Sequence, residues 1–255
     1  MLDRKDVIDL MAKAEEQTNG MVREKILAIL RLCEKYRYLG KRFTFDASEE
    51  LDAQVNHLLI QLSDALIDLA EEDILDIVDE EDSDAVLAYV HRDINGDNLT
   101  ERTDRYATQL RHFLEAYIAI LFARKTPQER LFEYIWNNIR DPWNAQIYRA
   151  AMNDPLFLSW AVTNGGLHYG RGRYNDVLSG ITLLTQDTIN TAFQYGKIAS
   201  YRRDPNIIGY TVHRGSTYDC QECDELCVGV HSLFEIVLPA HPRCMCYTIP
   251  VYSKD

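Results

Sequence analysis

The chain has 255 residues, of which 46% are hydrophobic and 26% are charged, with a net charge of −13. The length allows one or two domains with a buried core, and the lack of a run of about 18 apolar residues predicts no membrane span. All of the net negative charge lies in residues 1–100, which hold 24 acidic and 11 basic side chains. We expect this part to repel nucleic-acid phosphates and to form either a solvated acidic face or a surface for a basic protein partner.

The first two-thirds of the sequence predicts helices, because apolar residues recur at spacings of three and four. Ser48 is a good helix cap before a long leucine stripe, and Thr126-Pro127 marks a similar start. Asn19-Gly20 is expected to break the chain between the first two helices, and Gly40 is a plausible stop. The expected helices cover residues 3–17, 21–39, 48–69, 102–124, 127–139 and 185–200, and two short ones begin at Asp141-Pro142 and Asp154-Pro155.

Two polar segments are expected to connect helices. The acidic run at 80–84 is predicted to be a helix junction. The stretch NGGLHYGRGRY at 164–174 holds four glycines but lacks the spacing of a phosphate-binding loop, so it predicts a hinge or tight turn.

The character of the sequence changes after Asp204-Pro205-Asn206. The stretches IIGYTVHRG, FEIVL and MCYTIPVY are rich in β-branched and aromatic residues and predict strands. The expected fold class is α+β, with a mainly α-helical body and a small β-rich, zinc-stabilised C-terminal domain. We expect a helical body at 1–163, a loop and helix at 164–206 and the small domain at 207–255.

Five of the six cysteines lie in residues 220–246, and the sixth, Cys33, falls in a helical pattern where it is expected to be a core residue. The charged N-terminus lacks the apolar core of a signal peptide, so we expect a reducing cytoplasm, which favours a metal over disulfides. A CxxC pair begins the cluster and HPRCMC ends it. Two ligand pairs separated by a loop of about 17 residues are typical of a structural zinc site.

The expected zinc ligands are Cys220, Cys223, His241 and Cys244. Cys246 is the alternate for either member of the second pair, because alternate residues of a strand point the same way. Cys227 and His231, which also lie in the cluster, are expected to be spare.

Redox catalysis and catalytic zinc are less consistent with the same cysteines. A redox-active CxxC usually opens a helix after a strand in a thioredoxin-like fold, and no βαβ pattern surrounds this one. A catalytic zinc needs an open coordination position and a placed base, and nothing like HExxH occurs. A structural site fits better, because about 50 residues bury too little apolar surface to fold without help.

The C-terminal third, about residues 185–252, resembles the phage Mu F-like head morphogenesis domain of minor capsid proteins. That family pattern has a helix rich in Thr and Asn, a Gly-Tyr strand, a CxxC pair and a closing HPxCxC that runs into a Pro-Val ending. The corresponding stretches here are TQDTINTAFQYGKIAS at 185–200, IIGYTV at 207–212, YDCQECDEL at 218–226 and HPRCMCYTIPVY at 241–252.

The resemblance implies a structural minor head protein of a tailed phage or prophage. Such a protein acts in head morphogenesis through contacts with the portal and other head proteins, and is found in the virion after assembly in the host cytoplasm. The resemblance implies no enzyme activity, no membrane and no small-molecule substrate, and leaves open a role in DNA packaging or delivery.

Two alternative functions remain open. A toxin-type or metal-dependent effector enzyme with a zinc adaptor module would need an acid/base or nucleophile set in residues 1–200, where the sequence shows none. A zinc-stabilised nucleic-acid-binding adaptor would need a basic patch. Its residues would be Arg171, Arg173, Lys197, Arg202, Arg203 and Arg214.

Overall fold

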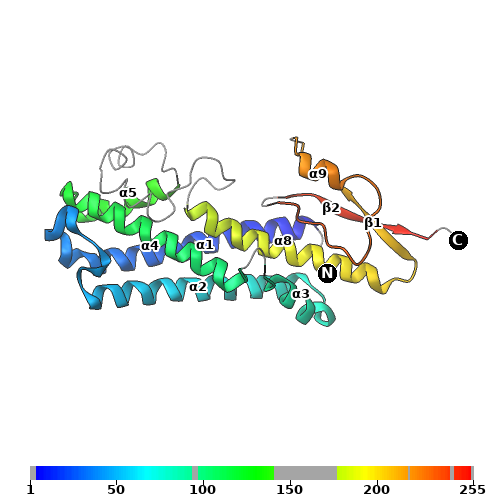
Figure 1. The fold of residues 1–255 in the computed structure, drawn as a ribbon, viewed down its shortest axis with the longest axis horizontal. Coiled ribbons are helices and arrows are strands. Elements are labelled where there is room, and N and C mark those ends of the chain that lie inside the picture. The colour runs from blue at the N-terminus through cyan, green and yellow to red at the C-terminus, as the bar shows by residue number, and fades with distance from the viewer. Residues whose placement is uncertain (1–3, 94–96, 141–176, 218, 242–243, 254–255) are drawn as a thin grey trace. The chain divides into compact units, whose positions relative to one another are not determined.

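The structure is a computed structural model, which describes residues 4–93, 97–140, 177–217, 219–241 and 244–253 (Figure 1). It is mostly helical, with a two-stranded sheet near the C-terminus and a cluster of cysteines and histidine beside it. The expected fold class, a helical body with a small β-rich C-terminal part, is therefore confirmed. Among the described residues, every helix is too short or too polar to cross a membrane.

The helices and strands follow the chain in a simple order. The α-helices are α1 (Arg4–Cys33), α2 (Glu49–Ile77), α3 (Ser83–Val90), α4 (Leu99–Ala123), α5 (Gln128–Arg140), α8 (Val177–Arg203) and α9 (Gln221–Leu226). The 3-10 helices are η1 (Glu34–Arg42), η2 (Phe45–Ala47) and η3 (Glu80–Asp82). The strands are β1 (Ile207–His213) and β2 (Tyr247–Tyr252).

The chain packs into two compact units that do not follow the order of the sequence. Unit 1 comprises Met1–Glu16, Ile67–Leu99 and Leu183–Asp255, and unit 2 comprises Gln17–Leu66 and Thr100–Thr182. The expected boundary at residue 163, the two short helices after Asp141 and Asp154, and the glycine-rich stretch all lie outside the described residues. The division into 1–163, 164–206 and 207–255 therefore stays a prediction.

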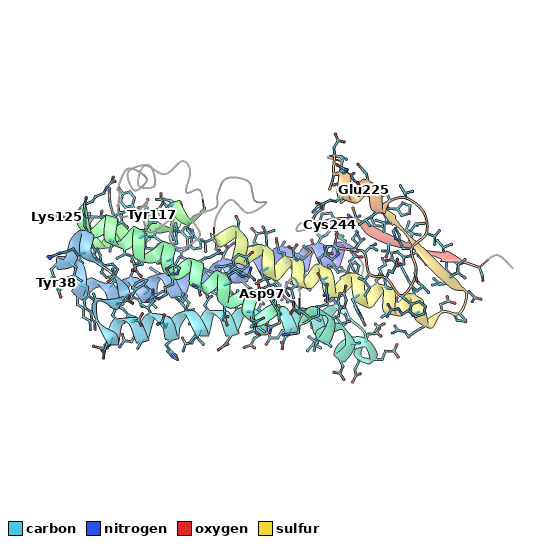
Figure 2. All side chains as sticks on the ribbon, viewed as in Figure 1. Tyr38, Asp97, Tyr117, Lys125, Glu225 and Cys244 are labelled. Carbon is cyan, nitrogen blue, oxygen red and sulfur yellow. The ribbon has the colours of Figure 1, made fainter. Side chains whose placement is uncertain are left out.

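Unit 2 has a helical core whose apolar side chains come from α1, α2, α4 and α5. Ile26, Leu62 and Phe113 are almost fully buried there, at the spacing that the sequence predicts for amphipathic helices. Tyr117, labelled in Figure 2, stacks on Phe113 with ring centroids 4.3 Å apart. Cys33 is 0% exposed, and burial raises the pKa of its thiol to about 12, which confirms it as an inert core residue.

Unit 1 has two apolar clusters, and α8 contributes to both, the first through its middle and the second through its C-terminal part. The first joins Val7 and Met11 of α1 to Ile74 of α2 and to Phe193 of α8. The second joins the C-terminal half of α8 to β1, to α9 and to the cysteine segment before β2. α8 is thus the element that links the helical part of unit 1 to its sheet.

The sheet is antiparallel, with Tyr210 of β1 opposite Pro250 of β2. On its other edge, β1 makes a single bridge, in which the backbone groups of Tyr210 and His231 exchange two hydrogen bonds. Within unit 1 the two strands lie between α9 and the C-terminal half of α8 (Figure 1). The Tyr201 hydroxyl of α8 donates to the Thr248 carbonyl at 3.2 Å, which fixes β2 against the helix.

Two sequence expectations are wrong within the described residues. Asn19-Gly20 does not break the first helix, because α1 runs without interruption through both residues. Glycine inside a helix costs only about 1 kcal/mol, and the buried side chains on either side of it outweigh that cost. The stretch FEIVL forms no strand, and the Tyr210 hydroxyl instead bonds its backbone, donating to the Glu235 carbonyl and accepting from the Val237 amide.

Unit 1 also contains a buried carboxyl group, that of Asp73, one of whose oxygen atoms lacks a hydrogen-bond partner among the described residues. Asp73 of α2 is 3% exposed, and among the described residues no hydrogen-bond partner lies near its Oδ2 atom. Burial is the main cause that raises the pKa of Asp73; Asp76 and Glu72 raise it further, while Lys13 opposes the shift.

We expect Asp73→Asn to raise the free energy of unfolding at pH 7. The folded state holds the Asp73 proton to a higher pH than the unfolded state, whose pKa is about 3.9. This group therefore costs nothing below that value, and its cost grows as the pH rises towards the folded-state pKa. Urea unfolding at pH 4 and pH 7 should show a gain at pH 7 that shrinks at pH 4. Asp68→Asn, at an exposed carboxylate of the same helix that is not among the charges shifting the Asp73 pKa, is the control, and an equal gain there would contradict the account.

Candidate metal centre

The first half of the centre is built around the start of α9. Cys220 precedes this helix in extended conformation, and Cys223 lies in its first turn. The helical turn points Cys223 inward, where its side chain is 3% exposed, while Cys220 stays partly exposed.

The second half is the irregular segment that leads into β2. Cys244 is 1% exposed and Cys246 is 3% exposed, and the Cys244 amide donates to the His241 carbonyl at 3.0 Å. Figure 2 shows Cys244 beside the start of β2. The two cysteines are separated by one residue in non-helical backbone, so both can turn to the same side, as the sequence predicts.

The two halves meet at Cys223. The His241 Nε2 atom lies 3.2 Å from the Cys220 sulfur and 3.1 Å from the Cys223 sulfur. The Cys223 sulfur lies 3.9 Å from the Cys244 sulfur. A tetrahedral zinc with Zn–S bonds of about 2.3 Å has S···S edges of about 3.8 Å, so this spacing suits a shared ion.

All five predicted ligands are therefore brought together. Two overlapping groups, Cys220/Cys223/His241 and Cys223/Cys244/Cys246, each have their ligand atoms within 4.8 Å of one another. Cys223 belongs to both groups. This cluster can hold a metal ion, and the choice of four ligands among the five stays a prediction.

The environment of the thiols disfavours redox chemistry at this CxxC pair. Burial raises the pKa of Cys223 and of Cys244, so in the absence of a cation both thiols keep their protons. A redox-active CxxC depends on the opposite shift, towards a stable thiolate. A bound cation would reverse the balance, because it replaces the thiol protons with a positive charge at the same place.

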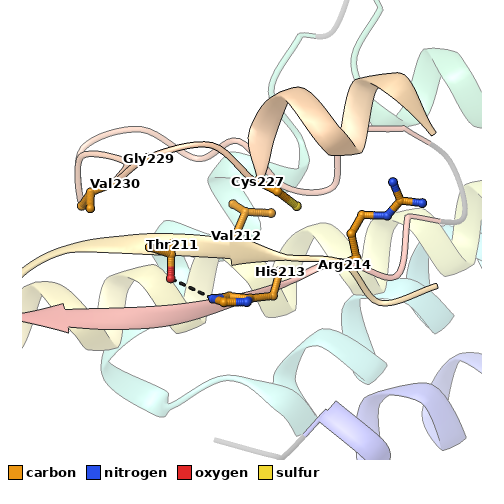
Figure 3. A pocket seen from close by; sticks show the side chains of 7 residues that line it. All are labelled: Thr211, Val212, His213, Arg214, Cys227, Gly229 and Val230. Atoms are coloured by element: carbon orange, nitrogen blue, oxygen red, sulfur yellow. Dashed lines mark hydrogen bonds between the residues drawn. The ribbon is translucent and has the colours of Figure 1, made fainter. Parts of the chain in front are cut away.

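The two residues that were expected to be spare lie outside these groups. The His231 Nε2 atom lies 2.7 Å from the Leu226 carbonyl, and its ring stacks on Tyr210. Cys227 ends α9 and lines an open groove of about 530 Å³ beside β1 (Figure 3). The groove is lined by Thr211, Val212, His213, Arg214, Cys227, Gly229 and Val230.

The groove opens because the second neighbour of β1 is interrupted. The residues just before the bridge at His231 could run beside β1, but Gly229 has a φ of +83° and turns the chain away. Among the lining residues, the Thr211 hydroxyl and the His213 Nε2 atom lie 3.0 Å apart, as the dashed line in Figure 3 shows. The geometry describes a gap at a sheet edge, and the metal cluster lies elsewhere.

The basic residues proposed for nucleic-acid contact are largely engaged inside the chain. Arg203 forms ion pairs with Asp79, Glu81 and Asp82, and Arg214 forms one with Asp224. Arg202 donates to the Leu233 carbonyl at 2.7 Å. Burial lowers the pKa of Lys197, because its charged form is poorly solvated. Arg171 and Arg173 lie outside the described residues, so a nucleic-acid surface stays a prediction.

Sequence patterns missed the polar residues that surround the second half of the centre. Asn190 and Gln194 of α8 are 6% and 2% exposed, and both donate hydrogen bonds to the backbone of the cysteine segment. The sequence signal that could have indicated them is a pair of amide residues, four positions apart, on a helix face that is otherwise buried. Such a pair indicates a polar partner, but the partner lies more than 50 residues away and is visible only in the fold.

No family model matches the sequence, and comparisons with curated proteins and with solved structures found no match.

We expect Cys223→Ser to abolish stoichiometric zinc binding, because Cys223 is the one residue common to both ligand groups. Native mass spectrometry of the purified chain should show one zinc per wild-type molecule and none in the variant. Cys227→Ser is the matched control, since this cysteine directly follows the same short helix and lies outside both groups, and it should retain the metal. Zinc retained by Cys223→Ser, or lost equally from both variants, would contradict this geometry.

Proposed function

We propose that this chain is a non-enzymatic structural protein, a minor head protein of a tailed phage or prophage. It acts in head morphogenesis through contacts with the portal and other head proteins, and a structural zinc closes its C-terminal part. The observation that supports this proposal best is the convergence of the CxxC and HPxCxC halves at Cys223, in the chain order of the Mu F-like pattern.

Zinc is the ion that suits this ligand set. The candidates are four cysteines and one histidine, and sulfur with imidazole nitrogen in a tetrahedral arrangement is the preferred surrounding of zinc. In a reducing compartment such cysteines stay available as thiolate ligands.

A structural role for the zinc is favoured over a catalytic one. The Cys223, Cys244 and Cys246 side chains are 3% exposed or less, which leaves little access for a substrate. Sites with three or four cysteines are typical of structural zinc, whereas catalytic sites keep a position open for water. The ion would join α9 to β2, two segments that the small sheet alone holds weakly.

The surface of this part of unit 1 suits contact with another protein. Five large hydrophobic side chains are more than half exposed there: Ile208 (61%), Val228 (75%), Val230 (59%), Phe234 (87%) and Tyr252 (57%). Large apolar side chains that stay exposed in one part of a chain are compatible with protein–protein contacts. They support a role that proceeds through protein contacts and add nothing for an enzyme.

The test is to purify heads from cells that carry the gene and to detect the chain by quantitative mass spectrometry. We expect the wild-type chain in heads in few copies relative to the major capsid protein, and Cys227→Ser at the same level. Cys223→Ser should be lost from heads, because the segment that the zinc closes can no longer present its surface. A wild-type chain that is made but absent from heads would contradict the proposed function, whatever its metal content.

A further inference from the structure

Three consecutive peptide carbonyls in the second half of the centre each accept a hydrogen bond from a side chain. The Asn190 Nδ2 atom donates to the Cys244 carbonyl at 2.8 Å, and the Gln194 Nε2 atom donates to the Cys246 carbonyl at 3.3 Å. Between them, the Arg4 guanidinium donates to the Met245 carbonyl at 2.6 Å. All three donors belong to helices of unit 1, α1 and α8.

These bonds answer a specific need of the backbone. The segment from Cys244 to Cys246 lies outside any strand or helix, so no ladder bonds its carbonyls. A buried carbonyl without a partner is strongly unfavourable, and each one here is satisfied from a neighbouring helix. Because the carbonyls of successive residues are bonded from fixed positions, the backbone that carries both cysteines is held in one conformation.

Arg4 also contacts the connection that leads to the first half of the centre. Its guanidinium lies over the Tyr247 ring at 4.7 Å and has a second, longer contact of 3.4 Å to the Gly215 carbonyl. Gly215 lies in the connection from β1 to Cys220. A Cβ atom at Gly215 would come within 1.6 Å of the Met245 carbonyl oxygen and 2.4 Å of the Arg4 Nη2 atom. The two segments that flank the cysteines thus approach as closely as glycine allows, and Arg4 joins them.

Asn190 and Gln194 act as a pair on α8. They lie four residues apart on one face of the helix, and Gln194 also donates to the Asn190 side-chain oxygen at 3.3 Å. Each amide is therefore held by its neighbour as well as by the carbonyl it serves. Such a connected arrangement restrains rotation of both side chains.

We propose that Arg4, Asn190 and Gln194 are positioning residues of the metal centre. They bind no metal themselves but hold the Cys244–Cys246 backbone so that its thiols face Cys223 before an ion arrives. This inference rests on the proposed zinc site and adds that its affinity is set by residues of α1 and α8. Thermodynamic reciprocity then requires that bound metal stabilises the docking of the first turns of α1.

The experiment uses the full chain and measures zinc affinity by competition with a chromophoric chelator, together with the absorption spectrum of the cobalt-substituted protein. Loss of one outer contact typically weakens metal binding at least about 10-fold. We expect that loss in Arg4→Ala, Asn190→Ala and Gln194→Ala, with altered cobalt bands. Arg4→Lys keeps one charged donor and should recover part of the affinity.

Gln186→Ala is the matched control. Gln186 is a glutamine of the same helix whose amide contacts the Met11 carbonyl at 3.4 Å and Glu15 at 3.0 Å, away from the cysteines. This variant should keep the wild-type zinc affinity and the wild-type absorption spectrum of the cobalt-substituted protein. If the three residues only stabilise the fold, their variants will unfold more easily, yet bind zinc with wild-type affinity and give the wild-type cobalt spectrum. That result would overturn the proposal.

A second measurement needs no variant. Hydrogen exchange of the wild-type chain, with zinc and after chelation, should show faster exchange at residues 4–10 when the metal is removed, and no change at 105–117 in unit 2. Unchanged exchange at 4–10 would overturn the coupling. The zinc titration of the wild-type chain tests the zinc site separately. A wild-type chain that binds no zinc overturns both the proposed zinc site and the positioning role of Arg4, Asn190 and Gln194. Tight binding that all variants share overturns only the positioning role.

Discussion

The C-terminal part of unit 1 depends on how three buried thiols are accommodated. Its apolar cluster holds nine buried residues, and Cys223, Cys244 and Cys246 are three of them. A core with so large a share of small thiols, next to a sheet of only two strands, offers limited apolar burial. One cation shared between the thiols would supply the cohesion that larger apolar side chains supply elsewhere. In its absence, burial keeps the Cys223 and Cys244 pKa values high and leaves the thiols neutral.

The helices extend this constraint beyond the cysteines. The strands, α9 and the cysteine segment belong to one compact unit with α8 and the start of α1. Tyr201 bonds the backbone of β2, while Asn190 and Gln194 bond the residues just before it. The metal centre is therefore framed by helices that lie far from it in the sequence, and the helical part of unit 1 contributes to its geometry.

The sequence predicted what depends on local spacing and missed what depends on distant contacts. Helices such as α4 follow from apolar residues three and four apart, and the metal ligands follow from two short motifs. The continuity of α1 through Asn19-Gly20 was missed, because packing on both sides outweighs a local preference. The strand expected at FEIVL was wrong for a related reason, since the hydroxyl of Tyr210, which is distant in sequence, bonds the backbone of this stretch. Arg4 lies 241 residues from the carbonyl it bonds, and only the fold brings them together.

The most direct test of the central claim, that one zinc ion joins the two halves of the cysteine cluster, is X-ray absorption spectroscopy at the zinc edge of the purified chain. The account predicts a first shell of three sulfur atoms at about 2.3 Å and one nitrogen at about 2.0 Å. These distances would correspond to His241 and three of the clustered cysteines, which requires both halves of the site. A shell made only of oxygen and nitrogen, or a chain that carries no zinc, would contradict the account.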